Sequence, residues 1–104
     1  MDRKVIWAEI AWSDLENAAD YIAKDSANYA AAFVSEARDA ARSLTNLAER
    51  GRVVPEFNNQ HLRELFVRNY RMIYQLTKDK VYILGFIHGS RDLWKLWGDE
   101  KRVL

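Results

Sequence analysis

The sequence predicts an α+β fold in which an N-terminal strand and an antiparallel helix hairpin pack on a mostly antiparallel sheet. Residues 62–93, LRELFVRNYRMIYQLTKDKVYILGFIHGSRDL, contain three short alternating or apolar runs separated by brief polar breaks, the pattern of a three-stranded meander. Residues 15–47 carry apolar side chains at helical spacing. Residues 4–11 are rich in Val, Ile and Trp, which favour a strand. The predicted order is therefore strand, two helices, three strands.

Composition limits the classes of function. The chain has 104 residues, 49% of them hydrophobic, so we expect one domain over residues 1–104 with a single core. It has no cysteine, which excludes disulfides, thiolate catalysis and Cys-based zinc sites. No charged and apolar leader is evident, and no apolar run approaches the ~18 residues of a membrane span. We therefore expect a cytoplasmic protein without membrane contact, cofactor or metal.

The net charge of +1 conceals an asymmetry along the chain. Residues 1–49 contain five Lys or Arg and nine Asp or Glu, whereas residues 50–104 contain eleven and six. This division predicts that the basic sheet half faces an anionic partner. The alternative is that these charges only solvate the surface.

The first half of the chain is expected to supply the first strand, over residues 4–11, and the first helix. Ser13 and Glu16 are spaced as a capping box, in which each side chain accepts a hydrogen bond from the other's backbone N–H. This helix is predicted to begin at Ser13 and to end near Lys24.

The second helix is predicted to start at Asp25 or Ser26, either of which can cap it, and to end before Gly51, which suits a left-handed C-cap. Its buried stripe is predicted from apolar residues at helical spacing: Tyr29, Phe33, Ala37, Ala40, Ala41, Leu44 and Leu47.

A loop is predicted at residues 52–61, because Pro55 is incompatible with a central strand and Asn58-Asn59 favours a turn. The three strands of the meander are then expected at residues 62–67, 70–76 and 81–87, with Asn69 taking a positive φ in the first connection.

Alternation along the middle strand puts Tyr70 and Met72 on its apolar face, so Arg71 is predicted on the other, open face of the sheet. The N-terminal strand is expected to join as an edge and to leave that face available to a partner. Leu93, Leu96 and Trp97 predict one turn of helix that docks back on the body.

These segments resemble the RelE/ParE superfamily of type II toxins, the toxic halves of bacterial toxin–antitoxin pairs. The resemblance is carried by RELFVRNYRMIYQL at residues 63–76 and VYILGFIHGSRDL at residues 81–93, and extends to WSDLE at residues 12–16 and GRVVPE at residues 51–56. It implies the same order of elements and a cognate antitoxin whose C-terminal segment covers the functional surface in a hetero-oligomer.

The superfamily includes two activities: RelE-type members cleave messenger RNA in the ribosomal A site, and ParE-type members poison DNA gyrase. RelE-like nucleases carry two lysines, two arginines and a tyrosine. Arg71 and Arg91 match the arginines, but the lysine positions fall on about Leu62 and Glu64 and the tyrosine position on Trp97. The sequence is more similar to the ParE-like branch, which implies growth inhibition through DNA gyrase.

The enzymatic alternative is a ribosome-dependent endoribonuclease with a substitute set of groups. Glu56 or Glu64 would be the base, His88 the acid, and Arg71 with Arg91 would hold the phosphate. The structural alternatives are that His88 is a satisfied histidine at a strand end and that Arg71 pairs with Glu64 across the hairpin.

Five side chains are expected to bind the target or the antitoxin: Arg63, Arg71, Arg91, Trp94 and Trp97. The arginines would pair with acidic antitoxin residues. Two alternatives are an ion pair between Arg91 and Asp92 and a packing role for the tryptophans. A third function also remains open, a degenerate, non-toxic module that only binds an antitoxin.

Overall fold

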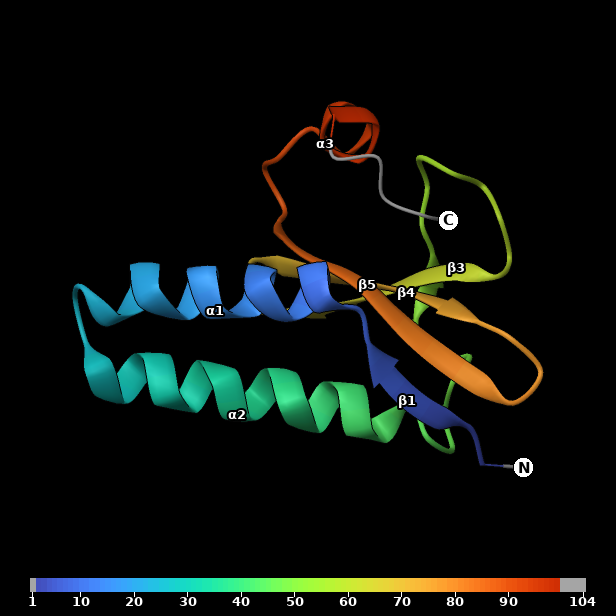
Figure 1. Cartoon of the computed structure of the whole chain (residues 1–104), viewed down its shortest axis with the longest axis horizontal. Coiled ribbons are helices and arrows are strands. Elements are labelled where there is room, and N and C mark those ends of the chain that lie inside the picture. Colours follow the sequence, from blue (N-terminus) through green and yellow to red (C-terminus); the bar gives the residue numbers. More distant parts are fainter. Residues whose placement is uncertain (1, 100–104) are drawn as a thin grey trace.

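The computed structural model describes residues 2–99, which contain three helices and a five-stranded mixed sheet (Figure 1). The elements are β1 (Lys4–Trp7), α1 (Glu9–Ala23), α2 (Ala27–Ser43), β2 (Arg52–Val53), β3 (Leu62–Val67), β4 (Tyr70–Leu76), β5 (Lys80–His88) and α3 (Leu93–Asp99). The strand order is β1-β5-β4-β3-β2, in which β1 pairs parallel with β5 and all other pairs are antiparallel. The predicted α+β fold, with its edge N-terminal strand and its meander, is confirmed.

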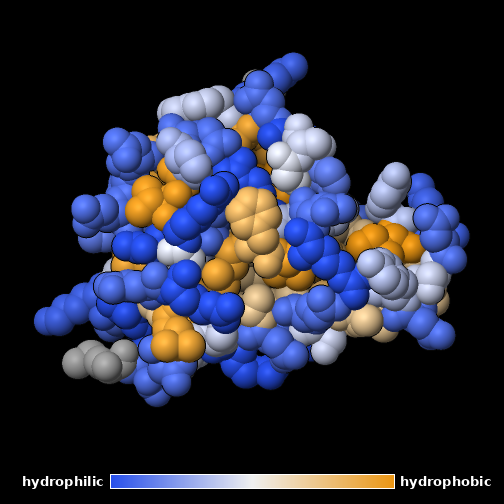
Figure 2. Space-filling model, turned by 180° about the vertical axis from the view of Figure 1, so that it is seen from behind, coloured by the Kyte–Doolittle hydropathy of each residue, from blue (hydrophilic) through white to orange (hydrophobic). Residues whose placement is uncertain are grey.

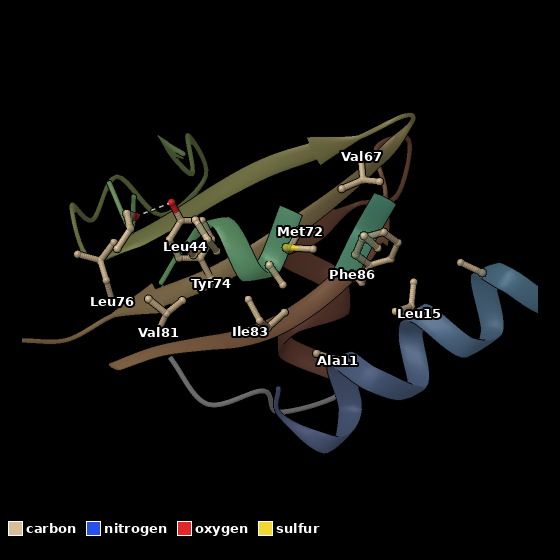
Figure 3. Packing of buried hydrophobic residues seen from close by; sticks show 14 of the residues in the cluster. Ala11, Leu15, Leu44, Val67, Met72, Tyr74, Leu76, Val81, Ile83 and Phe86 are labelled. Carbon is tan, nitrogen blue, oxygen red and sulfur yellow. Dashed lines mark hydrogen bonds between the residues drawn. The ribbon is translucent and has the colours of Figure 1, made fainter. Parts of the chain in front are cut away.

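The helix hairpin covers one face of the sheet. The helices lie side by side and antiparallel in Figure 1, and Figure 3 shows their side chains against β4 and β5. Alanines supply many of the helical contacts, which lets the backbones approach closely. The main cluster includes Ala11, Leu15, Phe33, Ala37, Ala41, Leu44, Met72, Tyr74, Ile83 and Phe86.

The predicted start of the first helix is wrong. Helix α1 begins at Glu9, Ala8 is its N-cap without a side-chain cap hydrogen bond, and Ser13 and Glu16 lie inside the helix. The N–H of Ala8 donates to Ile83 O, which continues the ladder of β1 up to the point where the helix begins. Tertiary packing sets this boundary, because the early helical residue Ala11 is fully buried.

Helix α2 starts as predicted and ends early. The Oγ of Ser26 accepts from the N–H of Tyr29 at 3.1 Å, which is an N-cap. The helix ends at Ser43, and the predicted buried positions Tyr29 and Leu47 are 53% and 57% exposed. Leu47 lies beyond the helix, where the chain no longer follows helical spacing.

Gly51 is not a left-handed C-cap, since no described glycine has a positive φ. A glycine is required at this position because there is no room for a side chain. A Cβ on Gly51 would lie 2.4 Å from the Tyr74 hydroxyl and 2.7 Å from Glu64 O. That hydroxyl accepts from the N–H of Gly51 at 3.0 Å. It also donates to Ala48 O at 2.8 Å, the bond that is dashed in Figure 3. Tyr74 thereby fixes the segment between α2 and β2 to the sheet.

The opposite face of the sheet is also covered, so the prediction of an open face and a single core is wrong. A second cluster joins Val54, Ile73 and Ile87 to the inner side chains of α3. Figure 1 shows α3 apart from the helix hairpin. The predicted docking of Leu93, Leu96 and Trp97 is confirmed, and these three side chains are 2%, 8% and 5% exposed.

The predicted bounds of the three meander strands are confirmed to within one residue. The first strand ends at Trp7 and not at residue 11, because α1 begins at Glu9, and the short strand β2 lies inside the predicted loop. Asn58 has φ 48°, as suits a turn, but in the β3–β4 connection the positive φ belongs to Arg68, at 55°, and not to Asn69. The guanidinium of Arg68 lies 4.0 Å from the centre of the Tyr29 ring and pairs with Glu36 of α2. These contacts with α2 hold the unusual backbone conformation of Arg68.

Candidate functional site

Four charged side chains form a network on the α3 side of the sheet, here called the Arg71 cluster, in which Glu64 and Arg71 are buried, Glu56 is half-buried and Arg52 is exposed. The Nη1 and Nη2 of Arg71 donate to the two oxygens of Glu56 at 2.8 and 2.7 Å. Its Nε donates to Glu64 Oε1 at 2.6 Å, and Arg52 Nε donates to Glu64 Oε2 at 2.7 Å. Each carboxylate of the cluster is therefore bound by a guanidinium.

The register of the hairpin produces this arrangement. Arg71 is opposite Phe66, so Glu64, two residues before Phe66, projects diagonally from the same face. Glu56 comes from the turn after β2, which Pro55 brings across the sheet. The prediction of Arg71 on an open face is wrong, because its side chain is 7% exposed, and the alternative pairing with Glu64 is confirmed.

These contacts shift the pKa values of Glu56 and Arg71. Hydrogen bonds from Arg71 hold the pKa of the Glu56 carboxyl below its ordinary value of 4.5, although partial burial opposes this. The same bonds, with those to Glu64, raise the pKa of Arg71. The two guanidinium groups and the two carboxylates of the cluster are paired with one another, so it offers neither a free base nor a free cation.

His88 lies apart from the Arg71 cluster. It is the cross-strand partner of Tyr70, and its ring meets that of Tyr70 edge-on at 5.2 Å. Since Tyr70 packs on the helix-hairpin side and Arg71 on the other, His88 and Arg71 project from opposite faces of the sheet. The Nδ1 of His88 accepts from the N–H of Ser90 at 3.1 Å and lies 2.7 Å from its Oγ, so His88 is a satisfied histidine at a strand end.

Arg91 is exposed and lines a hollow of about 280 Å³ together with Asp14, Tyr21, Tyr70 and His88. Within residues 2–99, no ion pair joins Arg91 to Asp92. Instead, Asp92 Oδ1 accepts from the N–H of Lys95 at 3.1 Å at the start of α3.

The other predicted binding residues divide between internal and surface roles. Arg63 donates to the backbone oxygens of Gln60 and Gly51 at 3.1 and 3.0 Å, which is a structural use of its guanidinium. Trp97 is buried, whereas Trp94 is 61% exposed. Of the five predicted binding residues, Arg91 and Trp94 present exposed side chains.

One surface feature, the contact between Arg52 and the exposed ring of Phe66, was not predicted as a site. The Arg52 guanidinium lies 5.1 Å from the centre of the Phe66 ring, and Phe66 is 54% exposed. Seen from behind, the molecule is mostly hydrophilic, with separate small groups of apolar side chains (Figure 2). The alternation along β3 could have predicted that Phe66 lies on the α3 side of the sheet. It could not have predicted that Phe66 is exposed to solvent, because the sequence does not show how much of the sheet α3 covers.

The part of the chain that the structure describes contains no cluster of three or more His, Asp or Glu suited to a metal ion. Over the same residues, no helix has the length and apolar character needed to cross a bilayer.

The order of elements is the one that the resemblance to the RelE/ParE superfamily implies. A family model described as the ParE toxin of the type II toxin–antitoxin system, parDE, matches residues 5–93. The chain therefore belongs to the ParE toxin family.

A solved structure of the chromosomal ParDE TA system from P. aeruginosa is similar, with a TM-score of 0.68 and 18% sequence identity. The alignment covers 83% of this chain and 95% of that chain. At this level of identity the likeness concerns the fold. No curated protein matches the chain.

Proposed function

We propose that this chain inhibits bacterial growth by acting on DNA gyrase in the cytoplasm, and that a cognate antitoxin neutralises it in a hetero-oligomer. Membership of the ParE family supports the toxin role. The observation that favours gyrase over messenger RNA is the Arg71 cluster, in which carboxylates occupy one of the two arginines that match those of a RelE-like nuclease.

RNA cleavage through the 2′-OH requires a base, an acid and cations around the reacting phosphate. Here Glu56 and Glu64 are bound by guanidinium groups, and the lowered pKa of Glu56 weakens it as a base. His88 projects from the other face of the sheet. The groups of the substitute nuclease set therefore do not meet around a common point, which supports an action by binding.

The surface proposed to contact the target is formed by Arg91 and Trp94, which lie at the start of α3 and are exposed. Trp and Arg are the residue types that most often dominate binding energy at protein interfaces. Replacement of either by alanine removes an exposed side chain without opening the core.

The test is expression of the chain without antitoxin, followed by a gyrase supercoiling assay and a translation assay on the same cells. We expect growth arrest with trapped gyrase. Arg91→Ala with Trp94→Ala should abolish arrest, while the control Arg42→Ala, at another exposed arginine, should not. Arrest with codon-specific cuts in messenger RNA and normal gyrase would establish the nuclease alternative. Unimpaired growth on full expression would establish a non-toxic module.

A further inference from the structure

A hollow of about 280 Å³ lies between helix α1, the C-terminal end of β5 and helix α3. Four elements line it: α1 with Asn17 and Tyr21, β4 with Tyr70, β5 with His88 and α3 with Leu96. Its volume is just below the roughly 300–1,000 Å³ of pockets that hold whole small molecules. The hollow therefore has room for one projecting side chain of a protein partner.

The buried lining of the hollow is apolar, and Tyr70 adds a hydroxyl donor. Ala18, Phe86 and Ile87 line the hollow and are buried. The Tyr70 ring is half-buried and stacks on the Phe86 ring at 5.3 Å, with an angle of 8° between the two planes. Burial raises the pKa of Tyr70, so its hydroxyl keeps its proton at neutral pH and can donate a hydrogen bond.

His88 presents a second donor to the hollow. The N–H of Ser90 donates to Nδ1 of His88, so the neutral imidazole carries its proton on Nε2. His88 is exposed and lines the hollow. Among the residues that the structure describes, none accepts a hydrogen bond from Nε2. This N–H is therefore available to an acceptor that enters from outside.

Arg91 supplies a positive charge at the same hollow. Its side chain is exposed, and over residues 2–99 no hydrogen bond or ion pair engages its guanidinium. Asp14, which also lines the hollow, accepts from the N–H of Phe86 at 3.0 Å and so holds α1 against β5. A guanidinium with neutral donors beside it is suited to a carboxylate, which it binds through two parallel hydrogen bonds.

We propose that the hollow receives the carboxylate of an Asp or Glu side chain that projects from DNA gyrase, and that this carboxylate pairs with Arg91 and accepts from Nε2 of His88. This inference rests on the proposed function, since it takes gyrase as the partner. The exposed Trp94 follows three residues after Arg91, so the hollow adjoins the surface already proposed for the target. A nucleic-acid phosphate fits less well, because the hollow is lined by a carboxylate of its own and by a single guanidinium.

The test is equilibrium binding of the full chain to purified gyrase, with a variant that fills the hollow. Asn17 is exposed on α1 and lines the hollow, so Asn17→Trp places a large side chain at its opening. This variant should bind gyrase about tenfold more weakly than the parent protein, or weaker still. The control Asn28→Trp, at an exposed residue of α2 outside the hollow, should bind as the parent does.

The charge of the occupant is tested through salt. If a carboxylate pairs with Arg91, gyrase binding by the parent protein weakens as salt is added. Arg91→Gln keeps a donor but removes the charge, so its binding should depend less on salt. The control Arg50→Gln, at an exposed arginine outside the hollow, should keep the salt dependence of the parent. Equal salt dependence in the two variants would overturn the carboxylate as occupant.

A further variant tests the hollow without added bulk. Tyr21 is 68% exposed, so Tyr21→Ala removes part of the lining without opening the core, and it should also weaken gyrase binding. Gyrase binding that neither Asn17→Trp nor Tyr21→Ala weakens would overturn the inference and leave the proposed function standing. Affinity lost for the antitoxin alone would overturn it too, in favour of that partner. A parent protein that does not bind gyrase would overturn both.

Discussion

At the scale of single residues, Arg71 holds the loop that contains Glu56 against the sheet. Its guanidinium is fully engaged by Glu56 and Glu64, and the Glu64 side chain is 0% exposed. A buried ion pair contributes little by itself, but removing one partner leaves the other as an uncompensated buried charge. The position aligned with a catalytic arginine in nucleases thus serves stability here.

The first prediction concerns the loss of this tie. Arg71→Ala should lower the free energy of unfolding by about 3–5 kcal/mol, because Glu64 loses a partner inside the protein. Equilibrium unfolding in urea measures the loss. Arg91→Ala, at an exposed arginine, should stay within about 0.5 kcal/mol of the parent protein. Similar losses for the two variants would contradict the structural role of Arg71.

The second prediction concerns pH. Because bonds from Arg71 depress the folded-state pKa of Glu56, its carboxylate stabilises the fold above the unfolded pKa, and this contribution is lost as the pH falls through the folded pKa. Glu56→Gln should therefore destabilise the protein at neutral pH, and its difference from the parent should shrink as the pH falls below 4.5. Urea unfolding across that range measures the difference. A constant difference would contradict the assigned cause.

Part of this site could be predicted from the sequence. The pairing of Arg71 with Glu64 follows from alternation and the hairpin register, both of which the apolar pattern of β3 and β4 specifies. The approach of Glu56 could not be predicted, because it depends on the path of an irregular loop. His88 was grouped with Arg71 because a histidine suits the role of the acid, whereas one step of alternation separates the faces of the sheet from which the two side chains project.

At the scale of elements, the turn between α2 and β2 depends on Gly51. The Tyr74 hydroxyl bonds both Ala48 O and Gly51 N–H, which brings the chain too close to the sheet for a side chain at position 51. The glycine is required for space and not for a left-handed backbone.

The third prediction follows from that close approach. Gly51→Ala should destabilise the protein by about 1–3 kcal/mol, the usual cost of overpacking. The matched control is Gly98→Ala in α3, where an added Cβ meets no atom within 4 Å and alanine favours the helix by about 0.5–1 kcal/mol. Thermal unfolding compares the two variants. The midpoint of unfolding should fall for Gly51→Ala and rise for Gly98→Ala.

The strands were predicted well and the helix ends poorly, for a physical reason. The alternating pattern of β3 and β4 fixes which residues are buried on each face, so their bounds at Leu62–Val67 and Tyr70–Leu76 were correct. The start of α1 is set by packing of Ala11 on the sheet, and the segment after α2 is held to the sheet by the Tyr74 hydroxyl. Neither contact is visible in local propensity, which favoured Ser13 and Gly51.

At the scale of the whole molecule, the charge division along the sequence does not map simply onto the surface. Several cations of the basic half are used internally: Arg63 by backbone oxygens, and Arg52 and Arg71 by carboxylates. The acidic half, by contrast, places four of its five cations along a groove of about 410 Å³ between β1 and α2: Arg3, Lys4, Arg38 and Arg42. A count of charges along the chain therefore misplaces the basic surface that a partner meets.

The fourth prediction is that antitoxin binding weakens as salt is added, because the groove cations are exposed and screened. Lys4→Glu with Arg38→Glu should reduce this salt dependence, and Lys24→Glu, outside the groove, should leave it unchanged. Titration calorimetry at several salt concentrations measures both. If the affinity of the two variants fell equally steeply with salt, the basic groove would not be part of the binding surface.

The parallel pairing of β1 with β5 also bears on the order of events during synthesis. Lys4 is matched with Lys80, so the first strand has no partner until most of the chain has been made. Contacts between residues so far apart form late, because a long loop must close first. A polypeptide released before β5 has been synthesised would lack the partner of β1 and could not complete the sheet. The full sheet can therefore form only after the ribosome has made residues 80–88.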